Sequence, residues 1–183
     1  GKEAQLFDFV GVGSSYTDVE NTSIDKGYFF NKRQEESYAQ VAVLGAEVAE
    51  ELFYSDPIGK NIKIKGRTFR VIGTLEERGN TFFGNLDSQV FIPVTTAQKD
   101  LLGIDYVNLI RAKVTDSSKV DVAQKEISRL LRHRHKIKEK GQEDFTILSM
   151  NQLLDVLGNV TGAIQAFLIM VVAISLVVGG IGV

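Results

Sequence analysis

The chain has 183 residues, a formal net charge of −2 at pH 7 and no cysteine. A chain without a basic excess lacks the field that nucleic-acid binding requires, and a chain without cysteine has neither disulfides nor thiolate metal sites. The residues before position 163 are numerous enough to bury the core of one domain or of two small ones.

The first part of the chain predicts a loop, a strand and a short helix. Residues 10–16 are apolar but interrupted by glycines, and the polar residues 17–26 are expected to form a loop. Residues 41–44 are a compact apolar run typical of a strand. In residues 46–53 apolar side chains recur at three- and four-residue steps, which predicts a helix.

Two runs of alternating apolar and polar residues, 61–65 and 67–75, predict the strands of a β-hairpin. Lys65 and Gly66 form the tight connection between them. The longer strand is expected to point four residues inward on one face: Phe69, Val71, Gly73 and Leu75. With a further strand at residues 90–94, residues 36–94 are expected to form a small β-rich unit that contains one helix.

A glycine-containing loop at residues 76–88 carries two adjacent aromatic residues, Phe82 and Phe83. An aromatic pair exposed at the loop tip would form a contact surface for a partner or for an apolar substrate. The alternative is that one of the two rings fills the core of the β-rich unit. The sequence leaves both interpretations open.

A strand, a helix and a second strand are predicted after the β-rich unit. Residues 106–114 alternate as a strand, residues 118–135 repeat apolar side chains at helical spacing, and residues 144–150 again suit a strand. Asp116 or Ser117 is placed to cap the helix. Together with the β-rich unit, these elements predict an α+β fold.

Motifs for catalysis and for metal or cofactor binding are missing from the sequence. Gly59 and Lys60 lack the flanking residues of a phosphate-binding loop, so the chain is not expected to bind ATP. His133 and His135 would point about 200° apart on a helix and are poorly placed to share a metal. Paired carboxylates are explained by a solvated surface. We therefore expect a chain that is not an enzyme and holds neither metal nor cofactor.

Residues 163–183 are an uncharged apolar run whose polar side chains are Gln165 and Ser175. At ~1.5 Å per residue they would form a helix of about 31 Å, close to the ~30 Å hydrocarbon core of a bilayer. The alternative, a buried helix of a soluble protein, seldom keeps about 18 or more apolar residues free of charge. We predict a transmembrane helix, preceded by a stalk at residues 151–162.

Small residues mark two features of this C-terminal region. Gly158 and Gly162 lower the helix propensity of the stalk and are candidates for a joint in it. Four small residues of the membrane segment are expected to let another helix pack closely against it: Ser175, Gly179, Gly180 and Gly182.

The charges that flank the apolar run indicate its orientation. Lys and Arg are absent from position 141 onward, whereas Glu143, Asp144 and Asp155 precede the run. Cytoplasmic flanks normally carry the basic excess. Residues 1–155 are therefore expected to be extracytoplasmic, with the apolar run in the cell membrane and in contact with lipid.

Several short motifs occur in a specific order, although each is weak alone. They are VAVLG at 41–45, LF at 52–53, DPIGK at 56–60, FRVIG at 69–73, VFIP at 90–93, LLR at 130–132 with His135, DF at 144–145, and the run from Ile174 to Gly182. In this order the chain resembles the extracytoplasmic core domain of MacB-type ABC transporter permeases, relatives of the FtsX and LolC/LolE permeases.

The resemblance implies an extracytoplasmic domain of two subdomains. One would be a βαβ-containing layer formed by residues 1–35 and 95–150, and the other an inserted β-rich unit formed by residues 36–94. A first membrane helix would lie upstream of Gly1, a second would begin near Ala163, and two more would follow.

The resemblance also implies a function and partners. Such permeases are thought to transmit ATP-driven conformational change across the membrane to the external domain, for export or efflux. ATP and Mg²⁺ would be bound by a cytoplasmic ABC ATPase domain or subunit, and two permease copies would form a homodimer. In a Gram-negative host, a periplasmic adaptor and an outer-membrane channel would complete the pathway.

Two other functions remain open from the sequence. The first is an FtsX-like transmitter that activates an external partner, such as a cell-wall hydrolase, without transport. The second is a plain membrane-anchored binding domain with one helix and no ATPase.

Overall fold

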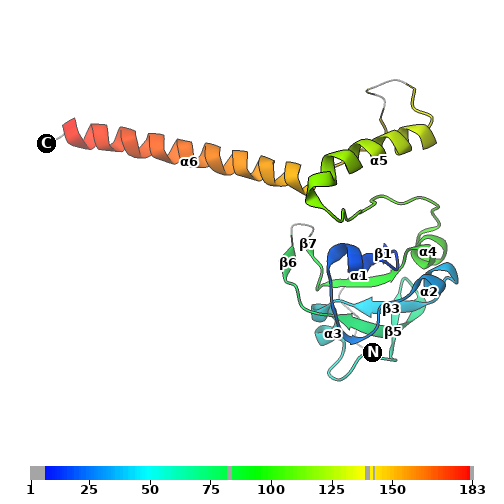
Figure 1. The fold of residues 1–183 in the computed structure, drawn as a ribbon. Helices are drawn as coiled ribbons and strands as arrows, with labels where there is room; N and C mark the ends of the chain where they lie inside the picture. The colour runs from blue at the N-terminus through cyan, green and yellow to red at the C-terminus, as the bar shows by residue number, and fades with distance from the viewer. Residues whose placement is uncertain (1–6, 82–83, 139–140, 142, 182–183) are drawn as a thin grey trace. The chain divides into compact units, whose positions relative to one another are not determined.

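The computed structural model describes residues 7–81, 84–138, 141 and 143–181. Contacts divide the chain into two compact units, residues 1–113 and residues 114–183, and each unit is described by itself. Figure 1 shows the strands of the first unit, coloured blue to green, and the helices of the second, coloured green to red.

A mixed β-sheet forms the frame of the first unit. Within the described residues its strands are β1 (Asp8–Val12), β2 (Ile24–Gly27), β3 (Val41–Leu44), β4 (Asn61–Ile64), β5 (Arg67–Leu75) and β8 (Gln89–Pro93). Their order is β1-β8-β3-β5-β2, and β4 also pairs with β5. β1–β8 and β3–β5 pair in parallel, and the other pairs are antiparallel. The long strand β5 therefore offers one edge to β3 and the other to β4 and then β2.

Short helices and a small hairpin connect these strands. They are α1 (Tyr16–Glu20), α2 (Lys32–Glu36), α3 (Ala46–Leu52), α4 (Val94–Thr96), the π-helical turn η1 (Ala97–Leu102), and the hairpin of β6 (Asn80–Thr81) with β7 (Gly84–Asn85). α2 begins with a capping box, in which Asn31 and Gln34 each accept the other's backbone N–H at 3.0 Å. α1 ends at Asn21, whose φ of 49° is left-handed, a conformation that Asn tolerates.

Each face of the sheet has its own apolar core, because successive side chains of a strand point to opposite faces. One core contains Ala42, Leu44, Val48, Phe69, Val71, Val90, Ile92 and Ala97. The other contains Phe30, Val43, Ile72, Leu75, Leu86 and Phe91. The ring of Tyr16 joins the second core, 5.1 Å from the ring of Phe91 and 6.0 Å from that of Phe29.

A β-bulge changes the facing of β5 part-way along the strand. Two successive residues of β3, Ala42 and Val43, lie opposite Val71 and Gly73, so Ile72 is an extra residue in β5. An extra residue reverses the facing of every residue that follows it. All four residues predicted to point inward are buried, but Gly73 and Leu75 lie on the opposite face from Phe69 and Val71, so the prediction of one shared face is wrong.

Other local predictions for the first unit are confirmed. β4 and β5 form the expected hairpin, and Lys65 and Gly66 at its turn have φ of 45° and 81°, as a type I′ turn requires. The strand predicted at residues 41–44 is β3, the helix predicted at 46–53 is α3, and the strand predicted at 90–94 is β8. The α+β class is confirmed as well.

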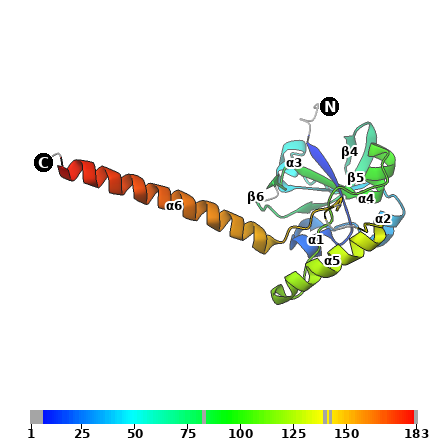
Figure 2. The same ribbon diagram turned by 90° about the horizontal axis from the view of Figure 1, so that it is seen from above.

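The second unit consists of helices and extended segments. It contains the 3-10 turn η2 (Ser117–Lys119), α5 (Val120–Arg134) and α6 (Met150–Ile181). The helix predicted at 118–135 is confirmed, and the carboxylate of Asp116 caps its start by accepting the backbone N–H of Ser118 at 2.9 Å. In Figure 1 and Figure 2, α6 runs as one unbroken helix.

The two strands predicted to flank α5 are not formed. Residues 106–114 and 144–149 are irregular, and α6 already begins at Met150. Alternation predicts a strand only where a neighbouring strand supplies hydrogen bonds and cover, and within the described residues neither segment is paired. Their apolar side chains are accordingly exposed, as at Leu109 and Leu148, which are 66% and 74% exposed.

Strand pairing also differs from the expected division into residues 1–35 with 95–150 and residues 36–94. β1 pairs with β8 and β2 pairs with β5, so strands from both expected subdomains share one sheet. The contacts instead divide the chain after Lys113. Pairing between distant strands leaves no mark in a local hydrophobic pattern, which is why the sequence did not indicate it.

Candidate functional site

Helix α6 is long and apolar on all sides. Its 32 residues extend about 48 Å at ~1.5 Å per residue. The segment Gln152–Leu176 is long and apolar enough to cross a membrane, and its most apolar window is entirely exposed. A core helix of a soluble protein would be mostly covered by neighbours, so α6 is a candidate membrane span.

The stalk and the span predicted from sequence are parts of this one helix. Gly158 and Gly162 both lie inside α6 with no break at either position. A Cβ atom added to either glycine would meet no other atom within 4 Å, so packing within the described residues does not demand glycine there. A joint at these residues stays a prediction.

Hydroxyl groups along α6 are satisfied by the helix itself. Ser175 Oγ donates to the carbonyl oxygen of Val171 at 2.9 Å, and Thr161 Oγ1 donates to that of Leu157 at 2.9 Å. Such internal bonds let a hydroxyl enter lipid without an unpaired polar group. Three of the small residues predicted to contact another helix lie in α6: Ser175, Gly179 and Gly180. The fourth, Gly182, lies outside the described residues. Helix packing through this set stays a prediction.

The aromatic pair Phe82 and Phe83 lies outside the described residues. The residues on either side form the β6–β7 hairpin, in which Asn80 lies opposite Asn85 and Thr81 lies opposite Gly84. The sequence predicted a loop here and missed the hairpin. Whether the pair is a contact surface stays open.

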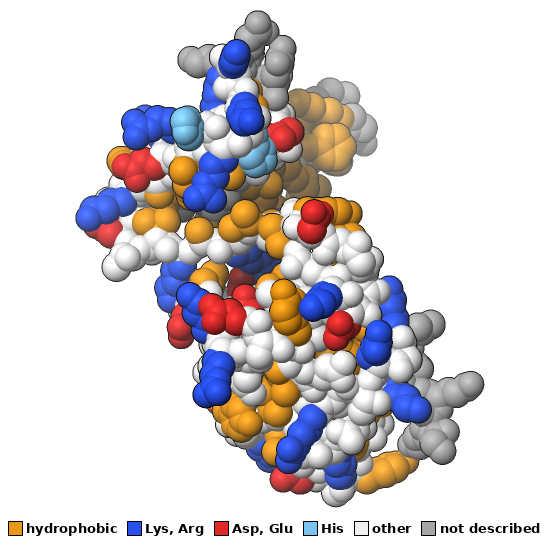
Figure 3. All heavy atoms as spheres, turned by 90° about the vertical axis from the view of Figure 1, so that its right-hand side faces the viewer, with side chains coloured by type: hydrophobic (Ala, Val, Ile, Leu, Met, Phe, Trp, Pro, Cys, Tyr) orange, Lys and Arg blue, Asp and Glu red, His pale blue; other side chains and the backbone are white. Residues whose placement is uncertain are grey.

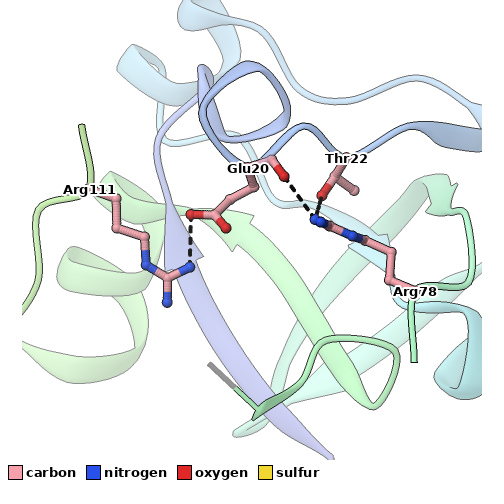
Figure 4. Close-up of polar contacts among 4 residues, drawn as sticks. All are labelled: Glu20, Thr22, Arg78 and Arg111. Atoms are coloured by element: carbon pink, nitrogen blue, oxygen red, sulfur yellow. Dashed lines mark hydrogen bonds and ion pairs between the residues drawn. The ribbon is translucent and has the colours of Figure 1, made fainter. Parts of the chain in front are cut away.

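A connector, residues 103–113, follows η1 and leads to residue 114, where the second unit begins. Its end is fastened to the turn after α1. Arg111 Nη1 donates to Glu20 Oε1 at 2.8 Å, and these side chains are 29% and 13% exposed (Figure 4). Partial burial makes this charge-assisted bond stronger than an exposed ion pair.

Lys113 fastens the connector to the same turn at a second point. Its Nζ donates to the carbonyl oxygen of Asp18 at 3.1 Å and to Oδ1 of Asn21. The left-handed conformation of Asn21 ends α1, so the Asn21 side chain and the last carbonyls of α1 serve together as acceptors. We call residues 18–22 the α1 turn.

Arg78, between β5 and β6, reaches the α1 turn from another direction. Its Nη1 donates to the carbonyl oxygen of Glu20 at 2.9 Å and to Oγ1 of Thr22 (Figure 4). The backbone N–H groups of Arg78 and Gly79 donate to the carboxylate of Asp87 at 3.1 and 2.6 Å. Asp87 is only 6% exposed, so these bonds supply the partners that a buried carboxylate needs.

Tyr16 lies where the α1 turn meets the aromatic core. Burial raises the pKa of Tyr16 above its ordinary 10.0, and the negative charge of Glu20 raises it further. The positive charges of Arg111 and Arg78 act in the opposite direction. The phenol thus responds to the charges that gather at this turn.

In the second unit, the C-terminal end of α5 is paired with the segment that follows it. Arg132 Nη1 lies 2.6 Å from Glu143 Oε1, and His135 Nδ1 lies 2.8 Å from Asp144 Oδ1. The ring of Phe145 meets the imidazole of His135 edge-on at 6.0 Å. Figure 3 shows the two histidines, in pale blue, among Lys and Arg side chains. Among the described residues, no group of three or more His, Asp and Glu side chains is arranged to hold a metal ion.

The sequence of the chain matches the model of a known protein family. Residues 1–130 match the family model of the MacB-like periplasmic core domain. The chain belongs to this family. The resemblance found in the sequence motifs is therefore confirmed, and the chain is a MacB-like periplasmic domain of an ABC permease that carries a candidate membrane helix at its C-terminal end.

Curated relatives of this MacB-like domain are named as ATP-binding/permease proteins. The macrolide export ATP-binding/permease protein MacB of Bdellovibrio bacteriovorus is 34% identical over 176 residues, which are 95% of this chain and 27% of that protein. MacB of Azoarcus sp. is 38% identical over 171 residues, which are 92% of this chain and 25% of that protein. The chain thus spans about a quarter of the length of these relatives.

Solved structures agree with the family. The periplasmic region of MacB from Actinobacillus actinomycetemcomitans superposes with a TM-score of 0.71 at 25% identity, covering 87% of this chain and 69% of that one. The extracellular domain of the transporter YknZ from Gram-positive bacteria gives 0.61 at 23% identity, covering 72% and 66%. The similarity to the YknZ domain, at this identity, shows that the two domains share a fold.

Sequence reasoning did not find the polar contacts at the α1 turn. Arg78 and Arg111 lie 58 and 91 positions from Glu20, and the residues beside each arginine form no recognisable motif. A single arginine far along the chain carries no spacing signal, so these partners became visible only in the fold.

Proposed function

We propose that this domain couples ATP hydrolysis in the cytoplasm to export, by transmitting a conformational change from the membrane to its extracytoplasmic part. The observation that supports this is the continuity of α6, which joins the stalk at residues 151–162 to the membrane span without a break. A helix without a break transmits displacement along its axis, whereas a flexible linker absorbs it. Residues 1–155 would lie outside the cytoplasm, as the acidic flank of the span suggests.

The partners follow from this role. A cytoplasmic ABC ATPase domain or subunit would bind ATP and Mg²⁺, and a second permease copy would complete a homodimer. In a Gram-negative envelope, a periplasmic adaptor and an outer-membrane channel would receive the exported molecule. Curated relatives are named as macrolide exporters, so a macrolide is the first substrate to test.

Insertions into the stalk of the full-length protein test the coupling. A flexible seven-residue Gly-Ser insertion after Leu157 should abolish macrolide resistance while membrane assembly and ATP hydrolysis persist. A helical alanine-rich insertion of the same length should retain more resistance, because seven residues keep nearly the same helix face. Normal resistance with the flexible insertion would rule out transmission through the stalk.

Deletion of the full-length gene separates export from signalling. Export predicts greater macrolide susceptibility in the deletion strain, restored by the intact gene. An FtsX-like transmitter predicts unchanged susceptibility together with a cell-wall or division defect.

A further inference from the structure

The α1 turn receives three cationic side chains from two distant segments of the first unit. Arg111 and Lys113 reach it from the connector, and Arg78 reaches it from the start of the β6–β7 hairpin. Glu20 binds both segments at once, because its carboxylate accepts from Arg111 and its carbonyl oxygen accepts from Arg78. The two arginines are thus bound to opposite ends of one residue, as Figure 4 shows.

Asp87 extends this arrangement to the base of the hairpin. Arg78 and Gly79 precede β6, and Asp87 follows β7, so the bonds from the two backbone N–H groups to the Asp87 carboxylate close the hairpin at its base. The guanidinium of Arg78 then fixes this base to the α1 turn. Two bonds from α3 also hold this region, from the Val48 N–H to the carbonyl oxygen of Asp87 and from Asn85 Nδ2 to Glu47. The contacts that Glu20 and Thr22 offer to Arg78 therefore fix the Arg78 side of the hairpin base.

The connector is held by polar contacts rather than by burial. Its central apolar side chains are exposed: Val107 by 50%, Leu109 by 66% and Ile110 by 73%. Polar contacts near solvent open more readily than a packed core. Displacement of the connector would therefore break the bonds of Arg111 and Lys113 before it disturbed the sheet.

We propose that the α1 turn is a releasable junction that couples the connector to the β6–β7 hairpin, with Glu20 as its positioning residue. When the connector leaves the turn, the Glu20 side chain and backbone become free to move, and the hold on Arg78 weakens. The hairpin is then the element of the first unit that responds to displacement of the connector. This inference rests on the proposed function for its biological direction, from membrane to hairpin, but the coupling itself is independent of transport.

Amide hydrogen exchange in the full-length, detergent-solubilised protein tests the coupling. The variant Arg111→Gln should raise exchange at the N–H groups of Arg78 and Gly79 several-fold, although neither residue contacts Arg111 in the bonds described. Exchange at Val71 of β5, whose N–H is bonded to the carbonyl oxygen of Lys60 just before β4, should stay unchanged and reports that the fold is intact. Lys32→Gln removes an exposed ion pair with the same change of charge and should leave all these sites unaffected.

Two further variants separate positioning from simple destabilisation. Arg111→Lys keeps the charge near Glu20 and should restore most of the protection at Arg78 and Gly79. Arg78→Gln combined with Arg111→Gln should add little to the exchange caused by Arg78→Gln alone, because both act through Glu20. Unchanged exchange at Arg78 and Gly79 in Arg111→Gln would overturn the junction while leaving export possible. Unchanged macrolide susceptibility in the deletion strain would overturn the proposed function while leaving the exchange result intact.

Discussion

The Nη1 atom of Arg111 lies 2.8 Å from Oε1 of Glu20, although 91 positions separate the two residues in sequence. The contact fastens the end of the connector to the α1 turn within the first unit. It differs from the pair of Lys32 and Glu36, whose side chains are 82% and 67% exposed and which are neighbours on one helix. The pair of Arg111 and Glu20 is partly buried and joins segments that are distant in sequence, so it contributes more to the fold than the pair of Lys32 and Glu36.

This comparison predicts unequal effects on stability. Glu20→Gln should lower the free energy of unfolding by about 1–2 kcal/mol, because a partly buried arginine loses its charged acceptor. Glu36→Gln should change it by less than about 0.5 kcal/mol. Urea unfolding of both variants, followed by fluorescence of the first unit's tyrosines, gives the comparison. Equal effects would contradict the special role of the Glu20 pair.

Titration of Tyr16 should report the charges at the α1 turn. Burial raises the pKa of Tyr16, and Glu20 adds to the rise, so Glu20→Gln should lower that pKa. Because the folded-state pKa exceeds the unfolded value, the phenol stabilises the fold fully below about pH 10, and this contribution is lost as the pH rises through the folded-state pKa. NMR titration of the Tyr16 ring carbon measures the pKa. An identical curve in Glu20→Gln would exclude the electrostatic contact.

Gly45 should tolerate no side chain. A Cβ atom at this position would lie 2.3 Å from the carbonyl oxygen of Asp87, which also accepts the N–H of Val48 at 3.2 Å. Gly45→Ala must push apart the start of α3 and the hairpin base, at a cost of about 2–3 kcal/mol. Gly13→Ala is the matched control, since no atom lies within 4 Å of its added Cβ. Thermal unfolding of both variants decides the matter, and equal melting temperatures would refute the clash.

A charge in the middle of α6 should impair membrane insertion. Met170→Lys places an ammonium inside both the predicted span 163–183 and the segment Gln152–Leu176, and should cost about 3 kcal/mol of insertion free energy. Leu148→Lys, just before α6, should have little effect. The two variants are compared in an insertion assay that scores which side of the membrane the segment after the helix reaches. Efficient insertion of the Met170→Lys helix would argue that α6 does not span the bilayer.

Local patterns predicted the elements whose formation depends on neighbours in sequence. The turn at Lys65 and Gly66, the cap at Asp116 and the apolar run of α6 were all predictable, because each is decided within a few residues. Strand β2 was missed and expected as loop. Its residues Ile24–Gly27 carry two charges and a glycine, and their extended form is imposed by pairing with β5.

Features that depend on distant contacts were beyond local patterns. The bulge at Ile72 arises from the register between β3 and β5, and alternation alone extrapolates one face through it. The contacts of Glu20 require the connector and the start of the hairpin to meet the same turn. Conversely, residues 106–114 have the alternation of a strand but no paired neighbour among the described residues, so the pattern predicted an element that is not formed.

The extra residue in β5 also limits how chains of this family can differ in length. Because β5 serves one core before Ile72 and the opposite core after it, losing or gaining a single residue in Arg67–Leu75 would move the side chains on one side of the change to the opposite face, away from the core in which they pack. The tip at Lys65 and Gly66 bears no such constraint. Alignments of related domains should therefore place their gaps at that tip and keep the nine positions of β5 ungapped.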